Sequence, residues 1–223
     1  MSRKTILLVY PYHRYFYLEY PWLPSASIFL ASTLLDAGYK VIIVDDRFSR
    51  EETLENIAEH IEDTVLIGFT TVSGSQLKNT VELIQWIRRD YDVPIVLGGS
   101  FPSAEPEMCL RDLPINYVIV GQGEYSLLKL ANFLTGKGSK EEISNLYWKD
   151  AQDNIGKSSQ KLERVNINSL PPLPYFNKEV ISVERYLNPE NRVVNYNTSD
   201  PKYFCRSNGL PTIPKPKVWK WWI

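Results

Sequence analysis

The feature that most constrains the fold is an alternation of short apolar runs with amphipathic segments over about the first 135 residues. Runs such as residues 5–10 are apolar throughout, as strands buried on both faces of a parallel sheet are. The segments between them repeat apolar residues at helical spacing. Because parallel neighbours need crossover connections, the alternation predicts a Rossmann-like α/β domain, with a five-stranded parallel sheet and helices on both faces.

The expected sheet has the flavodoxin-like strand order 2-1-3-4-5. Its strands are expected at residues 5–10, 40–45, 65–70, 94–97 and 115–120. Gly38 is placed to end the first helix, which starts near Ser25. Ligands of such sheets bind at the carboxyl ends of the strands, so the loops that follow the strands are the candidate site.

The pattern changes after residue 135. Residues 143–148 and 161–165 flank a polar segment and predict a small β-hairpin extension. Prolines then become dense, which is typical of a linker that wraps or crosses the domain rather than a core element. We therefore expect four parts: a domain at 1–136, the hairpin extension at 137–168, a linker at 169–199, and an atypical, disordered tail at 200–223.

Composition excludes several classes of protein. Lysine and arginine number 25 against 26 acidic residues, a net charge of −1, which argues against a nucleic-acid surface. No apolar stretch has the length of a membrane span, and the apolar run near the N-terminus is too short for a signal peptide. The two cysteines, Cys109 and Cys205, form neither a disulfide framework nor a CxxC pair. We expect a cytoplasmic protein that binds neither nucleic acid nor membranes.

Three loops rich in small residues follow three of the expected strands. They are Ser73-Gly74-Ser75, Gly98-Gly99, and the loop that contains Gly121, Gly123 and Glu124. Each loop alone is explained by an ordinary turn or helix start. The third loop is also not a GxGxxG phosphate motif, because it follows the last strand of the unit and not the first. Together at one edge of the sheet, they indicate a place where a bulky ligand approaches the backbone.

The two histidines do not predict a metal site. His13 follows the first strand and could ligate a metal there, but we favour a surface loop residue among aromatic side chains. His60 is expected at the end of the second helix. No Ser/His/Asp set, carboxylate pair or metal-ligand cluster stands out, so no catalytic residue and no metal ligand is predicted.

The chain resembles the cobalamin-binding domain that precedes the catalytic domain of cobalamin-dependent radical-SAM enzymes. The resemblance covers about residues 5–199 and rests on the order and spacing of several segments. These are ILLVYPY at 6–12, LASTLLDAGYKVIIVDD at 30–46, IGFTTVSGS at 67–75, IRRDYDVPIVLGGSFPSAEPE at 87–107, INYVIVGQGE at 115–124 and SLPPLPYF at 169–176.

The resemblance implies a cobalamin site whose nucleotide tail threads beside the small-residue loops. By this likeness, the tail channel is lined by Ser73, Gly74, Ser75, Gly98 and Gly99, and the site is bordered by Gly121, Gly123 and Glu124. Many cobalamin domains carry Asp-x-His-x-x-Gly after the first strand, but Pro11 and Phe16 stand where that motif around His13 needs Asp and Gly. We therefore expect no ligation by His13, with Tyr12 or its neighbours covering the lower face of the corrin.

A second departure concerns the cysteines. In the family, a segment like 192–199 leads into a Cys-x3-Cys-x2-Cys motif that holds an iron–sulfur cluster. Here only Cys205 follows, and the tail resembles unrelated or out-of-frame sequence after a truncated enzyme. The cluster and S-adenosylmethionine are thus expected only in a catalytic domain or subunit outside this chain.

The resulting interpretation is a cobalamin-binding module of a radical-SAM enzyme, a methyltransferase or a relative with similar radical chemistry, that is inactive by itself. One alternative is a Rossmann-like regulatory or interaction domain that no longer binds a cofactor. Another is a small nucleotide-using enzyme, which the lack of an acid/base set disfavours.

Overall fold

A single seven-stranded sheet organises the computed structural model, which describes residues 4–13, 22–150, 152–160, 164–175 and 177–187. The strand order is β2-β1-β3-β4-β5-β6-β7. The strands are β1 Thr5–Tyr10, β2 Lys40–Asp45, β3 Thr64–Thr70, β4 Ile95–Gly98, β5 Tyr117–Ile119, β6 Leu146–Lys149 and β7 Ile155–Lys157. The first five pair in parallel, and β6 and β7 are antiparallel to their neighbours.

The parallel part of the sheet confirms the expected order 2-1-3-4-5, but the count of five strands is wrong for the sheet as a whole. The hairpin does not stand apart, because Val118 of β5 pairs with Tyr147 of β6 and extends the same sheet. Its second strand is β7, not residues 161–165. Of those, 161–163 lie outside the described residues, and the other two are not in a strand.

The hairpin returns early because a local turn reverses the chain directly after β6. Asp150 Oδ1 accepts hydrogen bonds from the backbone N–H groups of Gln152 (2.8 Å) and Asn154 (2.9 Å). This short-range arrangement is the one that makes aspartate favourable in turns. The polar segment that was expected only to connect the two strands of the hairpin therefore already contains β7.

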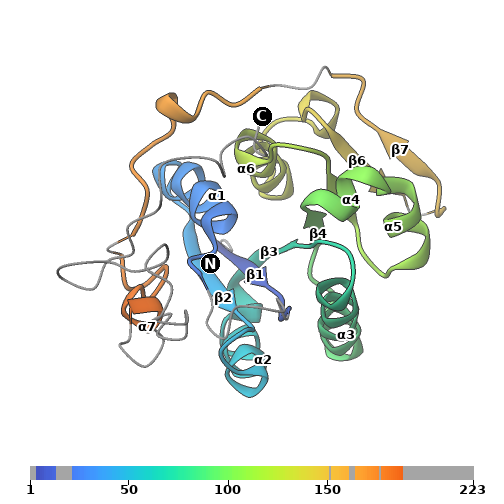
Figure 1. The fold of residues 1–223 in the computed structure, drawn as a ribbon. Coiled ribbons are helices and arrows are strands. Elements are labelled where there is room, and N and C mark those ends of the chain that lie inside the picture. Colours follow the sequence, from blue (N-terminus) through green and yellow to red (C-terminus); the bar gives the residue numbers. More distant parts are fainter. Residues whose placement is uncertain (1–3, 14–21, 151, 161–163, 176, 188–223) are drawn as a thin grey trace, which may run out of the picture.

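Helices cover both faces of the sheet, as the sequence predicts (Figure 1). α1 and α6 pack on one face, and α2, α3 and α5 pack on the other. The helices are α1 Ser25–Asp36, α2 Arg50–His60, α3 Ser75–Asp90, α4 Ser100–Ala104, α5 Pro106–Asp112, α6 Glu124–Leu134 and α7 Glu184–Leu187, with 3-10 turns at Ile61–Asp63, Lys140–Glu142 and Ile167–Ser169. His60 ends α2, as expected.

Gly38 ends α1 in the predicted way. The backbone N–H of Gly38 bonds to the carbonyl of Leu35, and that of Tyr39 bonds to the carbonyl of Leu34. With Gly38 at φ +84°, these two bonds form a Schellman motif, which satisfies the last carbonyls of the helix. The turn directs the chain into β2.

The proline-rich segment contributes to the core, which corrects the expectation of a linker outside it. Val180 and Ile181 are buried in the cluster that also contains α1 and α6. The N–H of Ile43 in β2 donates to the carbonyl of Val180 (2.9 Å), so this segment covers the outer edge of β2. The expected tail at 200–223 lies outside the described residues.

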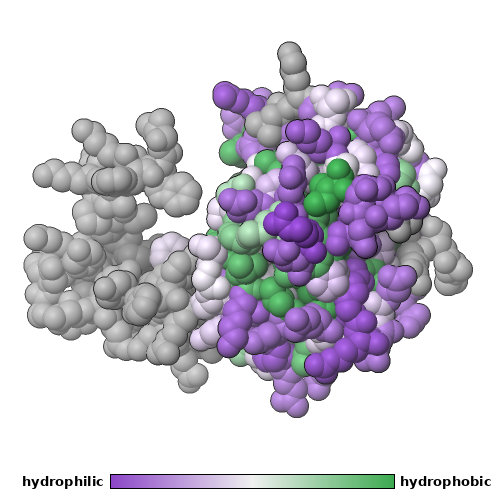
Figure 2. Space-filling view, turned by 90° about the vertical axis from the view of Figure 1, so that its right-hand side faces the viewer, coloured by the Kyte–Doolittle hydropathy of each residue, from purple (hydrophilic) through white to green (hydrophobic). Residues whose placement is uncertain are grey.

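The other edge of the sheet belongs to β7. Figure 2 views the molecule from that side and shows mostly hydrophilic side chains around a smaller hydrophobic area. In the part of the chain that the structure describes, no helix is both long and apolar enough to cross a membrane.

Candidate functional site

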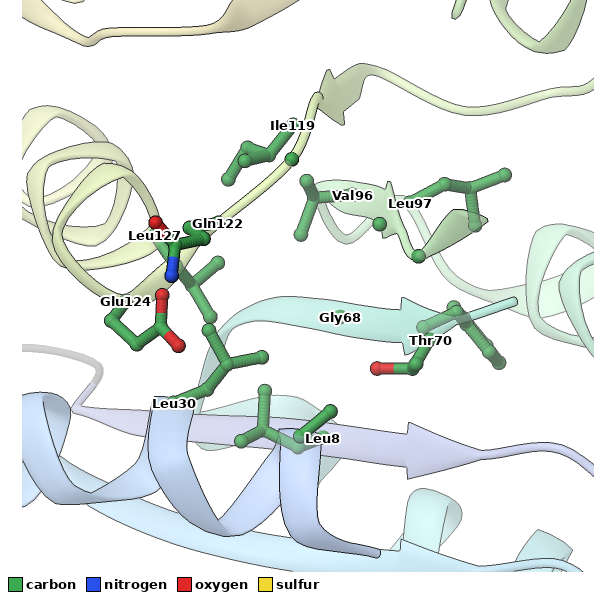
Figure 3. Close-up of a pocket in the computed structure, with 16 residues that line it drawn as sticks. Leu8, Leu30, Gly68, Thr70, Val96, Leu97, Ile119, Gln122, Glu124 and Leu127 are labelled. Atoms are coloured by element: carbon green, nitrogen blue, oxygen red, sulfur yellow. The ribbon is translucent and has the colours of Figure 1, made fainter. Parts of the chain in front are cut away.

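A pocket of about 250 Å³ lies between the sheet and the helix pair α1 and α6, at the carboxyl ends of the strands (Figure 3). Its walls are aliphatic side chains and glycines, with few polar groups. The lining residues come from β1 (Leu8), α1 (Ala26, Leu30), β3 (Gly68, Phe69, Thr70), β4 and the residue after it (Val96, Leu97, Gly98, Gly99), β5 (Ile119), and the last loop with α6 (Gly121, Gln122, Gly123, Glu124, Leu127). An apolar pocket with few polar groups suits a flat organic ligand.

The Gly98-Gly99 pair lines this pocket, but its two members have different roles. A Cβ on Gly99 would lie 2.5 Å from the carbonyl oxygen of Thr71, and its φ of +101° disfavours any side chain. A Cβ on Gly98 would meet only the carbonyl of Ile119, at 3.9 Å. Gly99 is therefore required by the crossing of two backbones, whereas Gly98 leaves open space in the pocket.

Gly121, Gly123 and Glu124 line the opposite wall of the pocket, where α6 begins. Ser103 Oγ accepts a hydrogen bond from the N–H of Gly121 (2.9 Å), and Thr33 Oγ1 donates to the carbonyl of Glu124 (3.0 Å). These contacts connect the loop to α1 and to the helices after β4. The Glu124 side chain lies at the α6 end of the pocket, beside Gln122 (Figure 3).

Gly68 is a pocket residue that the sequence interpretation missed. It lies in the middle of β3, where a Cβ would come within 3.2 Å of Leu8 Cδ2 and 3.6 Å of Val96 Cγ1. These two side chains line the pocket as well, so Gly68 keeps its floor open. An isolated glycine inside an apolar strand was the available signal, since it often marks a close approach.

Tyr12 and the Ser73-Gly74-Ser75 loop do not line the pocket. They lie together at the carboxyl edge, where Asn79 Nδ2 donates to the carbonyls of Tyr12 (3.1 Å) and Ser75 (2.8 Å). The loop leads into α3, and all three of its residues are exposed. Tyr12 is 41% exposed. These four residues form an open surface next to the pocket, not part of its wall.

The loop after β1 is held by buried polar contacts. The N–H of Tyr12 donates to Asp46 Oδ2 (2.9 Å), which also pairs with Arg50 (2.9 Å). Burial raises the pKa of Asp46, and the hydrogen bond from Tyr12 and the charge of Arg50 oppose that rise. Gln76 adds a third contact by donating to the carbonyl of Pro11 (3.2 Å). The start of the edge surface is thereby fixed relative to β2 and α3.

His13 is buried, so the expectation of a surface histidine is wrong. It is 8% exposed, and its ring packs edge-on against Tyr10 with 5.4 Å between the ring centres. Burial lowers the pKa of His13 to about 4, and the positive charge of Arg47 adds to this effect, while Asp45 opposes it. The imidazole is neutral at pH 7. Among the described residues, no three His, Cys, Asp or Glu side chains gather as a metal site would require.

The sequence was compared with curated proteins and solved structures. It is 26% identical over 172 residues to cytidylyl-2-hydroxyethylphosphonate methyltransferase from Streptomyces wedmorensis, a match that covers 67% of this chain and 31% of the relative. The radical S-adenosylmethionine methyltransferase TsrM from Kitasatospora setae, solved with cobalamin and a 4Fe–4S cluster, superposes with a TM-score of 0.61 at 26% identity. That match covers 77% of this chain and 31% of TsrM.

A second solved enzyme shares the fold. The cobalamin-dependent S-adenosylmethionine radical enzyme OxsB, with aqua-cobalamin and S-adenosylmethionine bound, superposes with a TM-score of 0.63 at 22% identity, over 76% of this chain and 24% of OxsB. The chain thus spans between about a quarter and a third of the length of these proteins. The family model of the B12-binding domain matches residues 17–131, just over half of the sequence. The chain therefore belongs to the B12-binding domain family and resembles the cobalamin-binding part of cobalamin-dependent radical-SAM methyltransferases.

Proposed function

We propose that this chain binds cobalamin at the carboxyl edge of its sheet, with the nucleotide tail in the pocket between the sheet and the helices α1 and α6. The observation that carries the proposal is the glycine-lined apolar pocket, whose floor and rim at Gly68, Gly98 and Gly123 carry no side chain. A flat aromatic base is the part of the cofactor that fits such a space. The corrin would then lie over the open surface formed by Tyr12 and the Ser73–Ser75 loop.

We further infer that His13 does not ligate cobalt. Its ring packs against Tyr10 and is buried. These contacts support a structural role for the imidazole in the interior of the domain. Replacing His13 with alanine should leave the visible spectrum of bound cobalamin unchanged, because a change of axial ligand shifts that spectrum. A clear shift in the spectrum of the His13→Ala variant would contradict this part of the proposal.

The wider role follows from the relatives. We propose that the domain supplies cobalamin to a radical-SAM catalytic domain or subunit, in a methyltransferase or an enzyme with related radical chemistry, in the cytoplasm. When bound, cobalamin supplies a cobalt centre that accepts and donates a methyl group. The residues of this chain hold and orient the cofactor, and the iron–sulfur cluster and S-adenosylmethionine belong to the partner.

The direct test is reconstitution of the purified chain with hydroxocobalamin, followed by gel filtration and a visible spectrum of the protein fraction. We expect a one-to-one complex with a dissociation constant that can be measured by titration. A protein fraction without cobalamin absorbance would instead favour the regulatory or interaction domain that has lost its cofactor.

A further inference from the structure

Glu124 is the acidic side chain in a pocket that is otherwise mostly aliphatic and glycine. It is the first residue of α6 and lines the pocket, and Figure 3 shows its carboxylate at the α6 end of the pocket, beside Leu30, Leu127 and Gln122. Its Oε2 atom is buried and has no hydrogen-bond partner among the described residues. The macrodipole explains an acidic residue at a helix start, but it does not explain a buried carboxylate oxygen without a partner in the wall of an apolar pocket.

A buried acceptor without a partner destabilises the protein relative to one that is hydrogen-bonded, and such atoms are rare in native structures. The structure leaves this oxygen to be satisfied by whatever enters the pocket. A carboxylate accepts hydrogen bonds and donates none. The group that lies against Glu124 must therefore carry an O–H or N–H donor, and it cannot be an anion.

The chemistry of the nucleotide tail narrows the choice. The dimethylbenzimidazole base has no N–H, because one ring nitrogen is bonded to the ribose and the other is an acceptor. The phosphodiester is an anion without donors. The free hydroxyl groups of the ribose are the donors of the nucleotide.

We propose that Glu124 recognises the nucleotide tail by accepting a hydrogen bond from a ribose hydroxyl. This inference rests on the proposed function, and it adds the residue that distinguishes a complete tail from a corrin without one. Gln122 supports it from the same loop. Its amide oxygen accepts from the N–H of Val165 (2.9 Å), so its NH₂ group is the end turned toward the carboxylate in Figure 3. A donor and an acceptor then stand side by side, and a hydroxyl group, which both donates and accepts, can bond to both.

The test compares two ligands that share the corrin ring. Hydroxocobalamin has the nucleotide tail, whereas diaquacobinamide lacks the base, the ribose and the phosphate of that tail. Dissociation constants for both are measured with the full chain and with the variants Glu124→Ala and Glu124→Gln. The isosteric glutamine guards against a folding defect. Glu59→Gln, on an exposed position of α2, is the matched control.

We expect the unchanged chain to bind hydroxocobalamin more tightly than diaquacobinamide. Glu124→Ala should weaken hydroxocobalamin binding by about tenfold or more, the value of a hydrogen bond to a charged group, and leave diaquacobinamide binding as it is. Glu124→Gln should give a smaller loss, because its amide oxygen still accepts. Glu59→Gln should change neither.

The outcomes separate the two proposals. If the unchanged chain prefers hydroxocobalamin and Glu124→Ala retains that preference, the role of Glu124 is overturned while cobalamin binding stands. If Glu124→Ala weakens both ligands equally, the carboxylate acts on the corrin or on the fold, and the inference is also overturned. If the unchanged chain binds neither ligand, the proposed function itself fails.

Discussion

Tyr186 donates a hydrogen bond from its hydroxyl to Oδ2 of Asp45 at 2.7 Å, joining two residues that are 141 positions apart in the chain. Asp45 ends β2, and Arg47 also binds its two carboxylate oxygens through Nε (2.8 Å) and an η nitrogen (2.5 Å). Nearby, Arg185 forms a bidentate pair with Glu52 of α2. The segment that ends in α7 is thus attached at the carboxyl edge of β2, on the same edge as the proposed cobalamin site.

The first prediction concerns this attachment. Tyr186→Phe should lower the free energy of unfolding by about 1–2 kcal/mol, because it leaves a hydrogen bond to a carboxylate unmade while the ring still packs. The change is measured by urea unfolding, with Tyr175→Phe as the control, since the structure shows no hydrogen bond of the Tyr175 hydroxyl to any described residue. Equal effects of the two substitutions would mean that the bond to Asp45 contributes nothing to stability.

The docked segment also shows what the sequence could not predict. The density of prolines predicted a linker that wraps or crosses the domain and is not a core element, whereas Val180 and Ile181 are buried. Proline content reports local stiffness, whereas burial depends on which surface the segment crosses. In the same way, the sequence predicted β1 to β5 because each is a continuous apolar run, and it misplaced β7 because that strand is three residues long and only partly buried.

The second prediction separates Gly98, the last residue of β4, from Gly99, which follows it, by their effects on stability. Gly99→Ala should lower the free energy of unfolding by about 3 kcal/mol or more, because its Cβ would overlap the backbone of Thr71 at a positive φ. Gly98→Ala, one residue earlier, should have a much smaller effect, since nothing lies within 3.4 Å of its Cβ. Thermal unfolding of the two variants compares them directly. Similar losses at both positions would show that the close approach to Thr71 is relieved by a backbone shift.

The third prediction uses Gly98 to test the pocket as the tail site. Gly98→Leu should fill open space in the pocket and weaken hydroxocobalamin binding by about tenfold or more, equivalent to ~1.4 kcal/mol, with little change for diaquacobinamide. Ser73→Leu lies outside the pocket, on the surface proposed to face the corrin, so any loss there should be the same for both ligands. A Gly98→Leu variant that binds hydroxocobalamin with unchanged affinity would place the tail elsewhere.

The candidate site was predictable in outline, because turns after parallel strands converge at one edge whatever the details of the sequence. Five of the nine site residues predicted, namely Gly98, Gly99, Gly121, Gly123 and Glu124, line the pocket. The sequence could not reveal the face of the sheet on which the pocket lies, since that depends on how far α1 and α6 stand from the strands. Because the sequence does not show this spacing, Leu8, Leu30 and Leu127 could not be distinguished from ordinary core residues.

The fourth prediction follows from the buried His13. Because its pKa is lowered to about 4 in the folded protein and is near 6.5 in an unfolded chain, the unfolded state binds more protons between these values. The stability that a neutral His13 contributes is therefore fully present above about pH 6.5 and is lost as the pH falls toward 4.

Replacing His13 with glutamine should accordingly reduce the pH dependence of stability in this window by about 1–2 kcal/mol, allowing for partial solvent screening. Urea unfolding at pH 7 and at pH 4.5 measures the difference for each protein. His60→Gln is the matched control and should retain the steep loss on acidification. If the unchanged chain and His13→Gln lose equal stability between the two pH values, the titration of His13 is not coupled to folding.

The fifth prediction is that this chain alone does not cleave S-adenosylmethionine to 5′-deoxyadenosine. That reaction needs an iron–sulfur cluster, which radical-SAM enzymes hold on three thiolates from one short motif, and the sequence contains only Cys109 and Cys205. Cys109 is buried in α5, and burial, followed by the charges of Asp112 and Glu105, raises its pKa to about 11, so it stays a thiol at neutral pH. Cys205 lies outside the described residues, and by itself it supplies one ligand where three are required.

Anaerobic reconstitution with iron and sulfide, followed by quantification of iron and of 5′-deoxyadenosine, is the measurement, and Cys109→Ser is the matched variant. We expect substoichiometric iron, no 5′-deoxyadenosine above a protein-free reaction, and no difference between the two proteins. Stoichiometric cluster incorporation with steady 5′-deoxyadenosine formation would show that the chain carries a catalytic centre of its own.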